Sequence, residues 1–528
     1  MSLTVNAAFE RVARVFRDYE AAVDSVSRLT FGEVDEASRR CVALLRAHGV
    51  RPGTRVALLT LPSTVHMVAW LAVVRLGAIP VVLHTREAAP LLARLCEKFG
   101  VGVVLHDASL GPAMARIAAE CGDPLTTVAL RSGAVGAAAG AAVEIPRDLV
   151  DYPPAQDLPT PAEDDTAVII LSSGTTSLPK GVAHSHRSVV DAARTAFGLY
   201  AGLRPGQRVI VPYSTAFTAC YATWVPFMNA GACSVFLEKF ELPEYQATIQ
   251  RERVTHMSLT PTMWRKLLTL DASAETYRSV HVAQFAAEPM DSTTLRQIRD
   301  LVSPNVVQVY GSTETFAFLT VNVAEDMTDE RLVSVGRPFA NAEVRVVRPG
   351  GTVDDVVPVG DLGEVVATSP SVATGIWGDD AMSDKLFHVD TQGRRWWRSS
   401  DLGRLDHDGF LFLEGRSDDM IISGGINIMP AAVEEVLLRH SSVIEAAVVG
   451  LPHPEWGQQV HAFVVTGDPA LTEEALAAFV SASSLSGYQR PREFHLIDSL
   501  PRTATNKLNR RALREDRAVP STAVAEDG

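Results

Sequence analysis

Cysteine, positive charge and long hydrophobic runs are all scarce in this sequence of 528 residues. Its five cysteines are scattered, without a C-x-x-C pair or a histidine at metal-ligand spacing, so neither a disulfide framework nor a zinc finger is predicted. We expect buried thiols in a reducing compartment, and therefore a cytoplasmic protein. The formal net charge of −14 argues against a nucleic-acid binder, which needs a basic surface.

No segment has the length of a membrane span. The best candidate, residues 67–83, is broken by Arg75, Gly77 and Pro80, whereas a span needs about 20 consecutive apolar residues. Charged residues begin at Glu10, where a signal peptide would have its apolar core. We therefore expect neither a membrane span nor export.

Hydrophobic residues make up 47% and charged residues 21% of the chain, a composition typical of globular proteins, and the length predicts two to four domains. From residue 29 to residue 105, and again from residue 209 to residue 309, segments with helical periodicity alternate with short apolar segments typical of buried strands. Such an alternation favours parallel sheets covered by helices on both faces. The sequence therefore predicts an α/β fold with two α/β subdomains.

The pattern changes beyond Gly336. Short β-type runs separated by Gly, Asp and Pro extend to Glu414 and predict a small β-rich subdomain. Residues 415–419, Gly-Arg-Ser-Asp-Asp, form the expected domain boundary, because a separate pattern of helices and strands follows them. We therefore expect a large N-terminal domain, residues 1–415, and a small α+β C-terminal domain, residues 416–528.

A segment rich in serine and threonine follows the predicted strand 166–171. It comprises Ser172, Ser173, Gly174, Thr175, Thr176 and Ser177, and then Lys180 and Gly181. Glycine lets backbone N–H groups face an anion, hydroxyls add donors, and lysine adds a mobile positive charge. The segment is not a Walker loop, because Pro179 precedes the lysine and Gly181 follows it. A phosphate-binding turn is predicted, and the alternative is an ordinary polar loop between a strand and a helix.

The residues Tyr310, Gly311, Ser312, Thr313, Glu314 and Thr315 end the second α/β series. They follow the predicted strand 306–309, and open α/β sheets bind ligands at the carboxyl ends of their strands. Glu314 would be an oxygen ligand for Mg²⁺, and Thr313 would donate a hydrogen bond to phosphate or carboxylate. The alternative is a structural turn with a surface glutamate.

Two later segments carry weaker signals. In residues 399–403 a tight turn would let Asp401 accept hydrogen bonds from ribose hydroxyls, although an aspartate in a turn usually bonds to its own backbone. Lys507 stands shortly before Arg510 and Arg511, a pattern that a solvated cationic tail would also explain.

Five motifs occur in order between Leu171 and Arg511: L-S-S-G-T-T-S-L-P-K-G-V, Y-G-S-T-E-T, S-S-D-L-G, L-E-G-R-S-D-D-M-I-I-S-G-G-I-N-I-M-P and P-R-T-A-T-N-K-L-N-R-R. Together they resemble the adenylate-forming superfamily of acyl-CoA synthetases, peptide-synthetase adenylation domains and luciferases. The D-D-M-I-I-S-G-G motif and the asparagine before Lys507 are most similar to the aryl-CoA ligase branch, of the benzoate and chlorobenzoate type.

The resemblance implies an AMP-forming acyl-CoA or aryl-CoA ligase. An acid and ATP with Mg²⁺ give an acyl-adenylate and pyrophosphate, and the thiol of coenzyme A then displaces AMP. Two alternatives stay open: a stand-alone adenylating enzyme that loads an acyl carrier protein, and a catalytically silent nucleotide-binding homologue. Whether the chain forms a homodimer also stays open.

The resemblance implies a role for each motif. Phosphate contacts are expected from Ser172, Ser173, Gly174, Thr175, Thr176 and Lys180. Nucleotide contacts are expected from Ala287, Glu288, Pro289, Tyr310, Gly311, Ser312, Thr313, Asp401 at the ribose, and Arg416. Coenzyme A contacts are expected from Gly424, Gly425, Trp456, Tyr488 and Arg490. Glu314 would hold Mg²⁺, Lys507 would bridge the acid carboxylate and the α-phosphate, and Asp418 would be the hinge of a mobile C-terminal domain.

The acid pocket is expected to be lined by Tyr213, Thr215, Phe217, Tyr221, Phe285, Phe316 and Phe318. These side chains are mostly aromatic, which favours a hydrophobic aryl or bulky alicyclic acid. Three residues depart from the family pattern, and one of them, Ser177, replaces a frequent glycine. Thr215 stands where many relatives have histidine, which predicts a wider pocket, and Ala287 stands where glycine is usual, which adds a methyl group beside the nucleotide.

Overall fold

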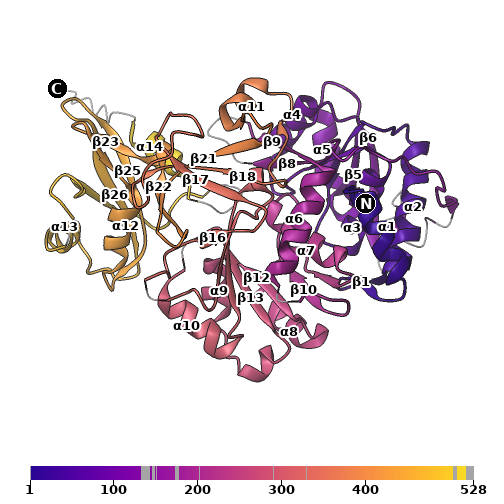
Figure 1. Ribbon diagram of the computed structural model, residues 1–528, viewed down its shortest axis with the longest axis horizontal. Helices are drawn as coiled ribbons and strands as arrows, with labels where there is room; N and C mark the ends of the chain where they lie inside the picture. The colour runs from indigo at the N-terminus through magenta and orange to yellow at the C-terminus, as the bar shows by residue number, and fades with distance from the viewer. Residues whose placement is uncertain are drawn as a thin grey trace, which may run out of the picture. The chain divides into compact units, whose positions relative to one another are not determined.

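The computed structural model describes residues 2–132, 143–145, 149, 151–172, 178–200, 202–288, 290–328, 330–483, 485–502 and 508–518. The chain forms two compact units (Figure 1). The N-terminal unit comprises Met1–Val344, Val366–Arg398 and Asp408–Leu411. The C-terminal unit comprises Arg345–Val365, Ser399–His407 and Phe412–Gly528. The expected division into residues 1–415 and 416–528 stays a prediction.

The first sheet of the N-terminal unit has the strand order β19-β9-β8-β4-β3-β5-β6-β7. Strands β3 to β8 are parallel, and β9 and β19 add an antiparallel edge. The strand bounds are β3 Arg55–Leu59, β4 Ile79–Val82, β5 Val103–Asp107, β6 Thr126–Ser132, β7 Val143–Ile145, β8 Thr166–Ser172, β9 Lys180–Ser185 and β19 Gly375–Ile376. The associated helices are α2 Phe31–Ala47, α3 Thr64–Arg75, α4 Ala89–Phe99 and α5 Gly111–Glu120.

The second sheet has the order β16-β15-β14-β13-β12-β10-β11-β1-β2. Its central strands are parallel, and β15, β16 and β2 are antiparallel to their neighbours. The strand bounds are β1 Glu20–Val23, β2 Arg28–Thr30, β10 Arg208–Val211, β11 Cys233–Phe236, β12 His256–Leu259, β13 Val282–Ala286, β14 Val306–Tyr310, β15 Thr320–Val323 and β16 Arg337–Pro338. The helices are α1 Val5–Val15, α6 His186–Leu199, α7 Thr218–Asn229, α8 Leu242–Glu252, α9 Pro261–Leu267 and α10 Ser292–Leu301.

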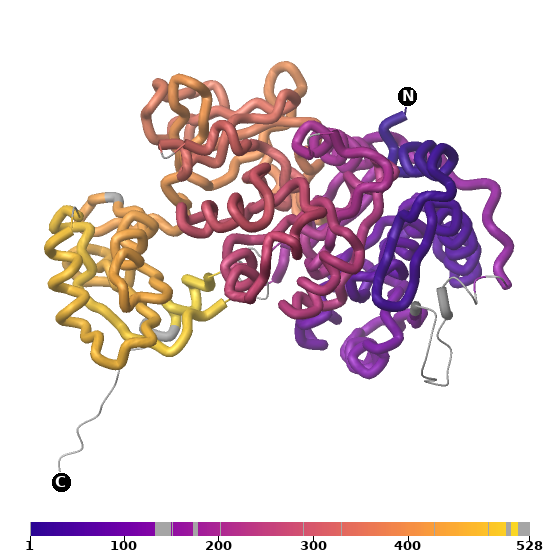
Figure 2. The backbone as a smooth tube through the Cα atoms, turned by 90° about the horizontal axis from the view of Figure 1, so that it is seen from below, coloured from indigo at the N-terminus to yellow at the C-terminus, as the bar shows by residue number. Residues whose placement is uncertain are grey.

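Helices between these two sheets form the largest hydrophobic core. Helix α6 packs on β8 and β9, α7 packs on β10 and β11, and the two helices pack on each other (Figure 1). Helix α3 is buried along its whole length, and its Trp70 meets Trp224 of α7 edge to face, with ring centroids 5.3 Å apart. The N-terminal helix α1, indigo in Figure 2, packs beside α6 and α7. The two sheets therefore share one core.

A third sheet lies between residues 343 and 416, as expected for a β-rich subdomain. Its order is β17-β18-β21-β20, with β22 beside β21. The bounds are β17 Glu343–Val347, β18 Gly363–Thr368, β20 Phe387–Val389, β21 Arg395–Leu405 and β22 Leu411–Arg416, with helix α11 at Asp380–Leu386.

The last part of the C-terminal unit has its own α+β fold. Its sheet has the order β24-β23-β26-β25, and β27 pairs with β26 in parallel. The bounds are β23 Ile421–Ser423, β24 Ile426–Ile428, β25 Val443–His453, β26 Gly457–Thr466 and β27 Glu493–Leu496. The helices are α12 Pro430–Leu438, α13 Glu473–Ser481 and α14 Arg510–Ala518.

The predicted fold class, a large α/β N-terminal part followed by a small α+β part, is confirmed. Among the described residues, no helix has the length and apolarity needed to cross a bilayer. The expectation that all five cysteines are buried is wrong for Cys121, which is partly exposed at the end of α5. The other four thiols are buried.

Candidate active site

The predicted phosphate-binding segment begins and ends in a β-hairpin. Strands β8 and β9 are antiparallel, and Ser172 pairs with Lys180. The segment therefore joins two strands and not a strand and a helix, as the alternative had it, because the chain returns along its own sheet. Phosphate binding by this turn stays a prediction. The next pair brings Leu171 beside Gly181, where a Cβ atom would collide with the ring of Phe99. The turn residues Ser173, Gly174, Thr175, Thr176 and Ser177 lie outside the described residues.

The segment after β14 is a tightly bonded turn. Residues Thr313–Thr315 form the 3-10 helix η4, which Ser312 caps by accepting a hydrogen bond from the N–H of Glu314 at 3.1 Å. A Cβ atom on Gly311 would collide with the backbone of Ala317, so only glycine fits there. Glu314 thus lies on a turn whose backbone is strongly specified, at the carboxyl end of a parallel strand.

His184 connects the hairpin to this turn. Its Nε2 lies 2.7 Å from the carbonyl oxygen of Thr313. A carbonyl oxygen only accepts, so Nε2 carries the proton and the ring is a donor there. Burial lowers the pKa of His184 to about 4, which keeps the ring neutral at neutral pH. No sequence motif singled out this histidine, because the bond to Thr313 joins segments that are distant in the chain.

Backbone bonds strengthen the same connection. The N–H of Ala373 donates to the carbonyl oxygen of Glu314 at 2.8 Å, and the N–H of Thr374 donates to that of Ala183 at 2.8 Å. The segment before β19 therefore bonds to both the turn and the hairpin. Three segments that are distant in the sequence hold Lys180 and Glu314 in one region of the N-terminal unit.

The donor chemistry of this turn fits a magnesium ion. Magnesium is usually held by one or two carboxylates together with substrate phosphate oxygens and water. Glu314 supplies one partly buried carboxylate on the turn that His184 joins to the strand with Lys180. Glu314 is therefore the residue that would hold Mg²⁺ here, and the ion would neutralise charge on the phosphates.

A buried polar network runs through part of the expected acid pocket. Thr215 donates to the carbonyl oxygen of Thr60 at 2.7 Å, and the hydroxyl of Thr60 lies 2.7 Å from Nδ1 of His66. The other ring nitrogen of His66 lies 3.2 Å from the hydroxyl of Tyr221. Burial lowers the pKa of His66 to about 3, so the network is neutral. Thr215 and Tyr221 are thus fixed by Thr60, which directly follows β3, and by His66 of α3.

The network adjoins the turn after β14. At the start of α7, Thr218 donates to the hydroxyl of Thr313 at 3.0 Å. Phe316 is fully buried and meets His184 edge to face, with ring centroids 5.0 Å apart. Tyr221, Phe316 and Phe318 belong to the same hydrophobic core. Phe316 therefore lies at the turn that carries Thr313, and Tyr221 and Phe318 share its hydrophobic core.

Other predicted pocket residues lie apart from that group. Phe285 belongs to a second core cluster, with Leu259 and Trp264. Phe217 is partly exposed, and its ring centroid lies 5.1 Å from that of His84. Burial raises the pKa of Tyr213, whose hydroxyl bonds to Ser258. The structure thus places Phe285 in the core around β12 and β13 and the Phe217 ring beside His84. Tyr213 lies between the two cores, because its hydroxyl bonds to Ser258 and its ring packs on the core with Tyr221.

The predicted nucleotide segment after β13 has a strained residue. Ala287 has a φ of +75°, a conformation that glycine adopts freely and that costs other residues about 1 kcal/mol. This explains physically why glycine would be usual at that position. Glu288 accepts a hydrogen bond from the hydroxyl of Thr262 at 2.7 Å, and Pro289 lies outside the described residues.

Asp401 does not lie in a tight turn, contrary to prediction. It lies within the long strand β21, where Ser400 has a φ of +61° and produces a local irregularity. Strand β22 runs beside β21, so Arg416 at its end comes within 3.5 Å of the Asp401 carboxylate. Asp418 follows in an exposed position, 3.9 Å from Arg416. The three residues therefore form a charged group in the C-terminal unit.

Lys507 lies outside the described residues, and Arg502 and Leu508 are the nearest described residues on either side of it. Arg502 and Leu508 form an antiparallel bridge, so the segment between them starts and ends at the same place. Arg510 is mostly buried and binds both oxygens of Glu434, at 2.7 and 2.8 Å. The alternative of a solvated cationic tail is therefore wrong for Arg510.

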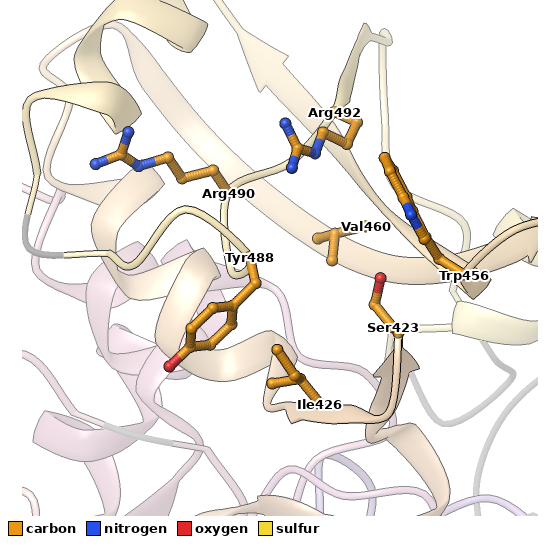
Figure 3. Close-up of a pocket in the computed structure, with 8 residues that line it drawn as sticks. Ser423, Ile426, Trp456, Val460, Tyr488, Arg490 and Arg492 are labelled. Atoms are coloured by element: carbon orange, nitrogen blue, oxygen red, sulfur yellow. The ribbon is translucent and has the colours of Figure 1, made fainter.

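Four of the expected coenzyme A contacts line one pocket of the C-terminal unit (Figure 3). The pocket has a volume of about 250 Å³ and is lined by Ser423, Gly424, Ile426, Trp456, Val460, Tyr488, Arg490 and Arg492. In Figure 3 the rings of Trp456 and Tyr488 lie on opposite sides of Val460, and both arginines lie along the upper edge. The pocket thus combines aromatic surface with positive charge.

Contacts around the pocket hold its side chains. The ring of Trp456 stacks on that of His453 with centroids 4.5 Å apart, and the guanidinium of Arg492 lies 5.3 Å from the Trp456 ring. Arg490 donates to the carbonyl oxygen of Leu485 at 3.1 Å. Arg492 was not predicted from the sequence, although it stands only two residues beyond Arg490 and repeats its charge.

Gly424 and Gly425 have φ values of +58° and +81°. A Cβ atom at either position would meet nothing within 4 Å. The positive φ angles, and not a lack of space, therefore favour glycine here. Their expected place beside the pantetheine arm of coenzyme A stays a prediction.

Comparisons with known proteins cover nearly the whole chain. The AMP-binding enzyme family matches residues 9–377, and the AMP-binding enzyme C-terminal domain matches residues 432–507. A 4-chlorobenzoate–CoA ligase of Arthrobacter sp. is 30% identical, over 96% of this chain and 95% of that protein. A methyl-dioxo-octahydro-indenyl-propanoyl:CoA ligase of Rhodococcus jostii is 29% identical, over 97% and 99%. The solved o-succinylbenzoate coenzyme A synthetase of Bacillus subtilis, in complex with ATP and a magnesium ion, is 26% identical with a TM-score of 0.81, covering 96% and 98%.

Replacement of His184 tests whether its hydrogen bond holds the hairpin beside the turn. His184→Ala should lower the rate of ATP–pyrophosphate exchange by about tenfold or more, because a lost buried hydrogen bond costs 1–3 kcal/mol. His256→Leu is the matched control. It also removes a buried neutral imidazole, but one that packs between Tyr200 and Phe227, and exchange should stay within about threefold of the wild type. Equal exchange in the two variants would contradict the proposed connection.

Proposed function

The chain belongs to the AMP-binding enzyme family and is an acid–thiol ligase of the AMP-forming acyl-CoA synthetase type, and we propose that it activates a hydrophobic aryl or bulky alicyclic acid. ATP and coenzyme A are its substrates together with that acid. The observation that carries the proposal is the His184 bond, because it holds the hairpin with Lys180 beside the turn with Glu314.

The first step must overcome repulsion between two anions. A carboxylate attacks the α-phosphorus of ATP, so its negative charge approaches a polyanion, and the barrier falls when cations neutralise that charge and align the reactants. We propose that Thr175, Thr176 and Lys180 bind the phosphates. Glu314 would hold the Mg²⁺ that neutralises them, and the Bacillus subtilis synthetase solved with ATP and a magnesium ion supports the presence of that ion beside ATP.

A second cation is proposed for the same step. Lys507 would lie between the carboxylate of the acid and the α-phosphate, where it would stabilise charge only while the bond to phosphorus forms. Asp401 and Arg416, which lie within 3.5 Å of each other, would bind the ribose side of the nucleotide. We propose that the C-terminal part then turns about Asp418, so that Lys507 leaves and the thiol can approach.

The acid class follows from the residues beside Thr313. Phe316 and Phe318 provide aromatic surface, and the Thr215–Thr60–His66–Tyr221 network is neutral. Such surroundings favour an uncharged ring on the acid over a second charge or an ammonium group. The Arthrobacter and Rhodococcus relatives are named for an aryl acid and a bulky alicyclic acyl group, which supports the same class.

Coenzyme A is proposed as the thiol because of the pocket at Trp456. Its adenine base would lie on the aromatic surface of Trp456 and Tyr488, and its phosphates would meet Arg490 and Arg492. A carrier protein is the other candidate thiol. It would present the same pantetheine arm without an adenine, so the nucleotide-binding character of the pocket favours coenzyme A.

An acid panel tests the proposed function. With ATP, Mg²⁺ and coenzyme A, the protein should form thioesters from benzoate-type or polycyclic alicyclic acids, detected by mass spectrometry, and at least about tenfold less from acetate or amino acids. If AMP is released only when coenzyme A is added, and no carrier protein is present, the protein is a CoA ligase and not a carrier-loading enzyme. If no acid of the panel supports pyrophosphate exchange, the protein is a catalytically silent homologue.

Replacement of Lys507 should separate the two half-reactions. Lys507→Ala is expected to abolish pyrophosphate exchange, because its charge acts only while the adenylate forms. Thioester formation from supplied acyl-adenylate and coenzyme A should stay within about threefold of the wild type. The control is Lys266→Ala, at an exposed lysine of α9, which should change neither rate. Equal loss of both half-reactions in Lys507→Ala would argue against the turning of the C-terminal part.

Replacement of Arg490 tests the proposed coenzyme A pocket. Arg490→Ala should raise the KM for coenzyme A by about tenfold, the effect of one charge-assisted hydrogen bond to phosphate. The KM for pantetheine should not change, because pantetheine lacks the nucleotide. The control Arg439→Ala removes an exposed arginine of the same unit, paired with Glu435, and should leave both constants unchanged. A parallel rise for coenzyme A and pantetheine would place the nucleotide elsewhere.

A further inference from the structure

Two neighbouring strands of the C-terminal unit place three metal-ligating side chains together. His461 lies on β26, and Glu493 and His495 lie on β27. In the parallel register His461 stands beside Glu493. Alternate residues of a strand share a face, so His495 projects on the same side as Glu493. The site is built by strand pairing, not by spacing along the chain.

The three ligand atoms form a triangle of the size that a metal ion requires. Nδ1 of His461 and Nε2 of His495 lie 3.1 Å apart, and Oε2 of Glu493 lies 3.6 Å from the first and 3.9 Å from the second. A point equidistant from these atoms lies about 2.1 Å from each, which is the distance that zinc keeps from imidazole nitrogen and carboxylate oxygen.

We propose that His461, Glu493 and His495 form a binding site for a divalent transition-metal ion of the zinc type. Two imidazole nitrogens exclude Mg²⁺ and Ca²⁺, which prefer oxygen ligands alone. Imidazole and carboxylate together suit Zn²⁺ and its neighbours in the first transition row. Three protein ligands leave one position of a tetrahedral ion for water.

Burial and surroundings suit such an ion. The side chains of His461 and His495 are only 9% and 12% exposed, whereas Glu493 is 56% exposed and gives the ion a route from solvent. The ring of Phe463 packs on that of His495, with centroids 4.6 Å apart, and limits its rotation. Without metal, the two imidazoles bond to each other. Metal binding requires His461 to carry its proton on Nε2 and His495 to carry its proton on Nδ1, so that the facing nitrogens are free to bind the ion.

The site lies on the strands that also carry the pocket at Trp456. Val460 and Arg492 line that pocket, and they directly precede His461 and Glu493. The N–H of Arg492 donates to the carbonyl oxygen of Val460 at 2.9 Å. Successive side chains of a strand point to opposite faces, so the ion would brace the strand pair from the face opposite the pocket.

Zinc titration of the full chain tests the proposal. The protein is treated with a chelator, dialysed and titrated with Zn²⁺ by calorimetry, and we expect one equivalent to bind. Glu493→Gln and His495→Gln, at the more exposed ligands, should each weaken zinc binding by about 100-fold or more. Loss of a group that only hydrogen-bonds to a metal ligand typically weakens binding by about 10–100-fold, and loss of the ligand itself should cost more. Zinc should also raise the melting temperature of the wild type but of neither variant.

His440→Gln is the matched control. His440 belongs to the same unit, where its ring packs on Phe479 and accepts from the N–H of Ser442, away from the three ligands. Its zinc affinity should stay within about twofold of the wild type. The chain has 14 histidines, so equal affinity in all four proteins would mean an adventitious ion only and overturn the proposal. Absence of zinc binding by the wild type would overturn it as well.

Discussion

The hydrogen bond between His184 and the carbonyl oxygen of Thr313 is the interaction on which the candidate active site depends. It joins an edge hairpin of one sheet to the turn that follows β14 in the other. These elements carry Lys180 and Glu314, the two charged residues proposed for the phosphates and magnesium. Because burial keeps the imidazole neutral, the bond does not change with pH near neutrality. A charged side chain in its place would be costly to bury and would disturb the phosphate site.

Much of the fold could be predicted from hydrophobic periodicity. Helices and buried strands were predicted to alternate from residue 29 to residue 105 and from residue 209 to residue 309, and the structure has α2 to α4 with β3 to β5 in the first range and α7 to α10 with β10 to β14 in the second. Their apolar segments are separated by short polar ones. Strand β9 was missed because its Lys-Gly start and its polar end, His184 and Ser185, are not typical of a strand. Only pairing with β8 makes those residues extended, and strand pairing between distant segments is not visible in a sequence.

The site was predictable where motifs are local and less so where strands assemble it. The turn at Glu314 is a compact motif and lies where expected, at the end of a strand. Asp401 was placed in a turn because Ser-Ser-Asp-Leu-Gly has turn composition, yet it continues a long strand and reaches Arg416 across a neighbouring one. The residues around Trp456 were named through resemblance alone, since three separate segments bring them together.

The pair β26 and β27 shows how one register can serve two sites. A parallel pairing puts Val460 and Arg492 on one face and His461 and Glu493 on the other, so any force that fixes the register positions both sets. Backbone bonds fix it in part, and His461 and His495 add a side-chain bond across the same strands. A one-residue slip would move Arg492 away from Trp456 and bring a glutamate into the pocket. The positive charge of the pocket therefore depends on residues on the opposite face that never touch its contents.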